Sequence, residues 1–207
     1  GLAHFQQLTG APDLARAAWE EARDLTARLH DELPADPDAF EVWVTARTRI
    51  AGLDWSQSRL AEAEQGFRAV FDQSAGVADP SSFLRSMRAL ASQMIARAGA
   101  KREGPERDAE IDRLLAASHA EHEALARDFP QNEVYAANLA ASWEGRGDRA
   151  RHNGELDRAR ECYEAARRGA ADLAQRTPGA AKYQRSLGLA YDRLADVARA
   201  QGELDDA

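Results

Sequence analysis

The chain has 207 residues, 44% of them hydrophobic and 30% charged, and its formal net charge is −8. Nucleic acid and anionic membrane surfaces repel such an acidic protein at long range, which argues against both as main partners. The sequence has neither the roughly 18 consecutive apolar residues of a membrane span nor a basic start followed by an apolar run, so we expect no membrane segment and no signal peptide. Its one cysteine, Cys162, excludes an internal disulfide and favours a cytoplasmic location.

Similar residues recur every 48 positions along the chain. A leucine or valine and a proline or serine each return at this step, at Leu29, Val77, Leu125 and Leu173 and at Pro34, Ser82, Pro130 and Pro178. A fixed period of about 20 to 50 residues is typical of proteins built from stacked repeats, each too small to bury its own apolar face. We therefore predict a single array with a partial repeat over 1–34, three whole repeats over 35–82, 83–130 and 131–178, and a partial repeat over 179–207.

Each of the first two repeats, 1–34 and 35–82, is predicted to contain a second helix with a small, an aromatic and a small residue along one face. These residues are Ala15, Trp19 and Ala22 in the first repeat and Ala63, Phe67 and Val70 in the next. Ahead of them, residues 1–8 predict the end of a first helix. Two tryptophans of the repeat 35–82, Trp43 and Trp55, are not fixed by the pattern. Trp55 is a candidate surface contact because tryptophan is enriched at protein interfaces.

The repeat 83–130 has two features of its own. Between its helices, the segment Gly99–Arg107 is charged and contains Gly and Pro, which predicts an exposed, mobile connection open to proteolysis. Its second helix carries His119 and His122, three residues apart, and two imidazoles at this spacing can approach one metal ion. Because no third ligand accompanies them, we expect both histidines on a solvated helix face and predict no metal site.

The repeats 131–178 and 179–207 follow the pattern most closely. In the first helix of the repeat 179–207, a buried stripe is predicted at Tyr183, Leu187, Tyr191 and Leu194. In the second helix of the repeat 131–178, a buried stripe is predicted at Ala159, Tyr163 and Ala166. The sequence Gly-Glu-Leu-Asp begins at both Gly154 and Gly202. We expect each glycine to end a helix with a positive φ, and the acidic residues after it to lie at the start of the next helix, where the helix dipole favours negative charge.

The repeats resemble the tetratricopeptide family. The resemblance rests on Leu187-Gly188-x-x-Tyr191 in a first helix, on Ala159-x-x-x-Tyr163-x-x-Ala166 in a second helix, and on Pro178 at the end of a repeat. The usual repeat has about 34 residues, so the longer period leaves about two extra turns in each helix. The resemblance implies an all-α, right-handed solenoid of antiparallel helical hairpins. Long-helix variants of this kind are similar to repeat arms found beside caspase-like proteases and Ser/Thr kinases in large bacterial proteins.

The resemblance also implies a concave groove lined by the first helices. The residues that would point into it are candidates for partner binding, namely Gln93, Arg97, Asn138, Glu144, Lys182, Arg185, Asp192 and Arg193. Some relatives hold a C-terminal carboxylate there with Lys, Asn and Arg side chains. Only Asn138 and Lys182 occupy matching positions in this sequence, so we do not expect that carboxylate clamp.

Two constellations have a catalytic or phosphate-binding interpretation that we do not favour. Cys162 and His152 lack a third orienting group and an oxyanion site, so they predict no thiol catalysis. Arginines are frequent from 146 to 168, but Asp and Glu alternate with them, which predicts a solvated face of ion pairs. These arginines are Arg146, Arg149, Arg151, Arg158, Arg160, Arg167 and Arg168. We predict no enzyme activity, no metal and no cofactor.

We interpret the chain as a non-enzymatic protein–protein interaction module that binds a peptide or a neighbouring domain in its groove. In this interpretation it is the regulatory or scaffold arm of a larger bacterial protein. One alternative is the regulatory part of a caspase-like protease or Ser/Thr kinase whose catalytic domain lies outside this chain. Another is a free-standing adaptor. The expected partner is a protein or peptide, and nothing in the sequence selects an oligomeric state.

Overall fold

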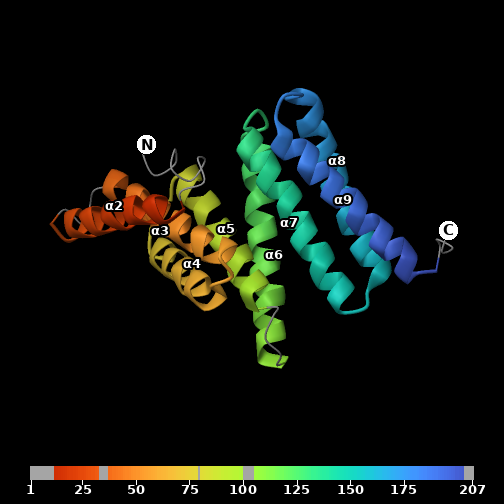
Figure 1. Cartoon of the computed structure of the whole chain (residues 1–207), viewed down its shortest axis with the longest axis horizontal. Coiled ribbons are helices and arrows are strands. Elements are labelled where there is room, and N and C mark those ends of the chain that lie inside the picture. Colours follow the sequence, from red (N-terminus) through yellow and green to blue (C-terminus); the bar gives the residue numbers. More distant parts are fainter. Residues whose placement is uncertain (1–11, 33–36, 79, 100–104, 203–207) are drawn as a thin grey trace. The chain divides into compact units, whose positions relative to one another are not determined.

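The computed structural model describes residues 12–32, 37–78, 80–99 and 105–202. Within these ranges every regular element is an α-helix, and there are eight of them (Figure 1). In chain order they are α2 Pro12–Glu32, α3 Pro37–Ser56, α4 Leu60–Ala75, α5 Ser82–Gly99, α6 Pro105–Asp128, α7 Glu133–His152, α8 Leu156–Arg176 and α9 Ala181–Ala200. None of these helices is both long enough and apolar enough to cross a bilayer. The predicted all-α fold is confirmed.

Each whole predicted repeat holds two helices, and the division of the chain into a single array of repeats stays a prediction. The repeat 35–82 holds α3 and α4, and the repeat 131–178 holds α7 and α8. The repeat between them holds α6 and nearly all of α5, which begins one residue early at Ser82. The chain divides into two compact units, Gly1–Arg107 and Asp108–Ala207. The right-handed turn of the whole array stays a prediction.

In the first compact unit, consecutive helices pack on one another. α2 packs on α3, α3 on α4 and α4 on α5, and α3 also contacts α5. The predicted face of α4 is buried, with Ala63 and Val70 fully covered and Phe67 2% exposed. At Gly66, α4 approaches α3 so closely that a Cβ added to this glycine would lie 2.8 Å from the Cβ of Ala51 on α3. The pattern of small, aromatic and small residues thus packs as predicted.

In the second compact unit, α7 packs on α8 and α8 packs on α9. The side chain of Tyr163 on α8 lies at the centre of its core, fully buried in a cluster with Ala150, Ala159 and Val197. The absence of a side chain at Gly147 lets the ring lie against α7, because an added Cβ would stand 2.5 Å from the Cε1 atom of Tyr163. The predicted second-helix stripe is therefore confirmed here as well.

The turns use the predicted chemistry. Gly154 and Gly202 have φ values of 78° and 72° and follow the ends of α7 and α9. Glycine adopts this left-handed conformation without the steric cost of a Cβ. At the start of α7, the side chain of Asn132 accepts hydrogen bonds from the backbone N–H groups of Val134 and Tyr135, at 3.0 and 3.4 Å. This cap satisfies two donors that the first helical turn leaves unpaired.

The structure corrects the predicted stripe of α9. Tyr183 is 3% exposed and Ala190 and Val197 are fully buried, so the buried line follows steps of seven residues. Two helical turns take about 7.2 residues, and residues seven apart therefore lie almost directly above one another. Tyr191 lies one position beyond this line and is 53% exposed. Its ring contacts the guanidinium of Arg167 on α8 instead, with 5.7 Å between the guanidinium carbon and the ring centroid.

Some expectations fall outside the described residues. These are the end of a first helix at 1–8, the side chain of Ala15, and the centre of the charged connection, at 100–104. The cleavage expected in that connection stays a prediction.

Candidate partner-binding site

Four side chains form an exposed stripe along α9. The predicted site residues Lys182, Arg185 and Asp192 are all exposed, and their spacing places them on one side of the helix. Leu189 lies on the same side, between Arg185 and Asp192, and is 49% exposed. We call these four residues the α9 stripe. Sequence reasoning did not select Leu189 as a site residue, although it lies one turn from Arg185.

The neighbouring side of α9 is fixed to the rest of the second compact unit. The hydroxyl of Tyr183 donates a hydrogen bond to the Glu133 carboxylate on α7, at 3.0 Å. Together with a hydrogen bond from Thr177, this contact holds the pKa of Glu133 below its usual value. The predicted groove residue Arg193 pairs with Asp148 on α7, at 3.4 Å. The α9 stripe is therefore displayed by a helix that is anchored along its length.

The remaining predicted groove residues lie on two other helices. Asn138 and Glu144 are half-buried on α7, in the same compact unit as the α9 stripe. Gln93 and Arg97 lie on α5, in the first compact unit. Gln93 is 2% exposed, and this corrects its prediction as an open groove residue. The physical reason is that α5 packs on both α3 and α4, which leaves little of its surface accessible.

The structure also corrects the expectation that His119 and His122 are solvated, because they are 7% and 0% exposed. The Nδ1 atom of His119 lies 2.9 Å from the Ser142 hydroxyl, and its ring meets Trp143 edge-on with centroids 4.1 Å apart. Neither ring nitrogen of His122 has a hydrogen-bond partner among the described residues. Burial lowers the pKa of His122 to about 4, so this ring is neutral near pH 7.

The repeat contained the signal for this burial. Ser74 and Ala170 stand 48 positions before and after His122, and each is 1% exposed. Position in the repeat thus predicts burial here better than the usual preference of a polar side chain for solvent. No group of three His, Cys, Asp or Glu side chains suited to a metal ion occurs among the residues that the structure describes.

Cys162 and His152, for which no thiol catalysis is predicted, lie in different environments. Cys162 is 3% exposed on α8, and burial raises the pKa of its thiol. His152 is exposed at the end of α7. A raised pKa disfavours the thiolate, which is the reactive form of cysteine.

The predicted ion pairs within the arginine-rich segment are confirmed at two positions, and Arg149 is a third arginine that pairs with another helix instead. Arg158 pairs with Glu155 at 3.0 Å, and Arg167 pairs with Glu164 at 2.9 Å. Arg149 joins α7 to α6 through Asp108 and Asp112, at 2.9 and 2.7 Å.

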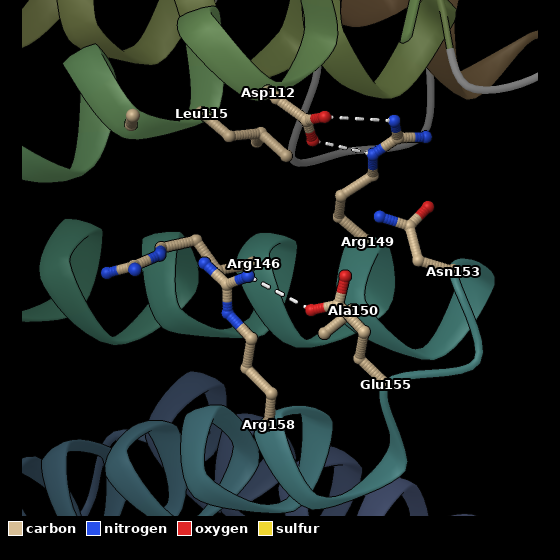
Figure 2. Close-up of a pocket in the computed structure, with 9 residues that line it drawn as sticks. Asp112, Leu115, Arg146, Arg149, Ala150, Asn153, Glu155 and Arg158 are labelled. Atoms are coloured by element: carbon tan, nitrogen blue, oxygen red, sulfur yellow. Dashed lines mark hydrogen bonds and ion pairs between the residues drawn. The ribbon is translucent and has the colours of Figure 1, made fainter. Parts of the chain in front are cut away.

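A pocket of about 300 Å³ opens beside these arginines in the second compact unit (Figure 2). We call it the arginine pocket. It is lined by Asp112, Leu115, Ala116, Arg146, Arg149, Ala150, Asn153, Glu155 and Arg158. Three helices and the turn after α7 contribute to it, so its existence depends on tertiary packing. Alternating charges along the chain do not by themselves indicate a concave site.

No protein-family model matches this sequence, and no curated protein is significantly similar to it. Among solved structures, the chain is similar to the crystal structure of BtubC (BKLC) from P. vanneervenii. The two are 16% identical, the similarity covers 95% of this chain and 94% of that one, and the TM-score is 0.37.

Proposed function

We propose that this chain is a tetratricopeptide-like interaction module that binds a protein partner at the α9 stripe. The observation that carries the proposal is the exposed sequence of cation, cation, apolar residue and carboxylate along one anchored helix, formed by Lys182, Arg185, Leu189 and Asp192. Interfaces of this kind combine an apolar contact with a polar rim that selects the partner.

The anchoring of α9 supports binding with little rearrangement. The contacts from Tyr183 to Glu133 and from Arg193 to Asp148 tie the helix to α7. At its other end, Gln201 donates a hydrogen bond to the Asp157 carboxylate on α8, at 2.7 Å. A surface that is already ordered loses less conformational entropy when a partner binds.

Charge reversal on the α9 stripe tests the proposal. The variant carries Lys182→Glu and Arg185→Glu, and the matched control carries Arg113→Glu and Arg168→Glu. All four side chains are exposed, and both double variants change the net charge equally. Each protein is immobilised after its helicity is checked by circular dichroism, and the proteins it retains from source cells are quantified. We expect the original chain and the control to retain a common partner that the stripe variant loses.

A folded stripe variant that retains the same partner as the control would contradict the proposal. Retention of no protein by the original chain would contradict it as well.

A further inference from the structure

The arginine pocket combines an apolar surface with guanidinium groups. Leu115 and Ala150, which are 7% and 4% exposed, give it apolar lining, and Asn153 contributes an amide. Its volume of about 300 Å³ lies at the lower end of the range for small-molecule sites, about 300 to 1,000 Å³. The space thus suits a single side chain better than a cofactor.

One of its three arginines is fully engaged within the protein. The guanidinium of Arg149 donates hydrogen bonds to both carboxylate oxygens of Asp112, at 2.7 and 3.1 Å (Figure 2). It also donates one to Asp108, at 2.9 Å. Its side chain is 10% exposed. Arg149 therefore fixes the wall that α6 and α7 share and has few donors left for a ligand.

Arg146 is held in place without using its donors. Its guanidinium lies over the ring of Trp143, 4.8 Å from the centroid, and Trp143 in turn meets His119 edge-on. Within the part of the chain that the structure describes, no carboxylate pairs with Arg146, and Figure 2 draws no interaction from it to another lining residue. An arginine oriented by stacking keeps its N–H groups ready for a planar acceptor.

The third arginine has only a weak internal partner. The side chains of Arg158 and Glu155 are 60% and 43% exposed and form a pair three residues apart. An exposed pair of this kind contributes little to stability, so an incoming carboxylate can replace Glu155 at small cost.

Local pairing leaves one cation of the lining for a ligand. Asp112 and Asp108 both pair with Arg149, and Glu155 pairs with Arg158, whereas no carboxylate pairs with Arg146 among the described residues. A singly charged carboxylate can pair with Arg146, whereas a phosphate dianion would be repelled more strongly by the acidic side chains nearby.

We propose that the arginine pocket binds the side-chain carboxylate of an aspartate or glutamate in a protein partner. The methylene groups of the ligand lie against Leu115 and Ala150, and Arg146 and Arg158 donate hydrogen bonds to its carboxylate. The proposal rests on protein binding as the function of the chain but not on the α9 stripe. The pocket also lies on a different side of α7 from the predicted groove. Each helical residue adds about 100°, so Arg146 projects about 200° around α7 from Glu144, which the groove interpretation places on the concave side.

The test uses the whole chain and a blocked peptide, Ac-Ala-Ala-Glu-Ala-Ala-NH₂, with its glutamine counterpart as the neutral control. Nuclear magnetic resonance follows the side-chain Nε–Hε signals of the arginines during each titration. We expect the signals of Arg146 and Arg158 to move saturably with the glutamate peptide, with a dissociation constant of about 1 to 10 mM, as for a weak site with two charge-assisted donors and a small apolar contact. The glutamine peptide leaves them in place.

Three variants connect the signal to the pocket. Arg146→Gln weakens binding about fivefold, and Arg168→Gln, which changes an exposed arginine of α8 outside the pocket, leaves it unchanged. Glu155→Gln strengthens binding about two- to threefold because it removes the internal competitor for Arg158. The Glu155 variant does not disturb the stacking on Trp143, so its result stands even where Arg146→Gln lowers stability.

Several results would overturn the proposal. These are no saturable movement of the Arg146 signal, equal movement with the glutamine peptide, unchanged affinity in both pocket variants, or tighter binding of inorganic phosphate than of the glutamate peptide. The variant Lys182→Glu/Arg185→Glu separates the two proposals, because we expect it to bind this peptide normally. Failure of the peptide titration with intact partner capture therefore removes the pocket alone.

Discussion

Substitution of Gly147 by alanine tests the packing between α7 and α8 most sharply. Alanine is normally more favourable than glycine inside a helix, by about 1 kcal/mol. At this position the new Cβ would lie 2.5 and 2.7 Å from two ring atoms of Tyr163, well inside the usual carbon–carbon contact of about 3.5 to 4.0 Å. The ring is fully buried and its hydroxyl donates a hydrogen bond to Asp148 at 2.8 Å, so it has little room to move.

Overpacking of a core costs about 1 to 3 kcal/mol, which outweighs the helix propensity of alanine. Gly147→Ala should therefore destabilise the protein by up to about 2 kcal/mol. Gly188→Ala on α9 is the matched control, because nothing lies within 4 Å of a Cβ added there. This control should stabilise the same compact unit by about 1 kcal/mol.

Urea denaturation followed by circular dichroism measures both effects. The midpoint should fall for Gly147→Ala and rise for Gly188→Ala, and the cost of Gly147→Ala should shrink in a Tyr163→Leu background. Equal shifts of the two midpoints in the same direction would refute the close contact between Tyr163 and α7.

Two further predictions concern buried and capping groups. The folded-state pKa of His122 is about 4 against 6.5 for an unperturbed histidine, so the unfolded chain binds more protons as the pH falls below about 6.5, and stability present at pH 7 is lost towards pH 4. From pH 7 to pH 5 the loss of stability due to His122 is about 2 kcal/mol. Urea midpoints measured at pH 7 and pH 5 should show that His122→Leu lacks this loss. An identical pH dependence in the variant would contradict the lowered pKa of His122. Asn132→Ala removes the cap of α7 and should lower the free energy of unfolding by about 1 kcal/mol in the same assay. The control Gln131→Ala lies just outside the cap and should change it by less than about 0.5 kcal/mol. Equal effects of the two substitutions would argue against the cap.

The all-α fold and the positions of its helices were predictable because the 48-residue period relates each expected helix to a counterpart in the next expected repeat. Second-helix residues such as Phe67 and Tyr163 occupy equivalent positions, and both are buried as expected. Gly154 and Gly202 also follow from the local sequence, since a helix that ends in a left-handed residue favours glycine.

The errors have a common physical origin in packing between helices. His122 looked solvated because histidine is polar, but its repeat position faces the core. Tyr191 looked buried because it continued a helical spacing, but the burial of α9 follows Ala190. The arginine pocket could not be foreseen, because ion pairs such as Arg149 with Asp112 depend on how α7 packs against α6, which the charge pattern within one helix does not indicate.

Site-specific photocrosslinking at Leu189 tests the central proposal most directly. A benzoylphenylalanine at this position replaces the 49% exposed side chain at the centre of the α9 stripe, and the same group at the exposed Arg113 on α6 provides the control. Irradiation of source cells should join the chain to one defined protein from position 189 and not from position 113. Equal labelling from the two positions, or no adduct from position 189, would contradict partner binding at the α9 stripe.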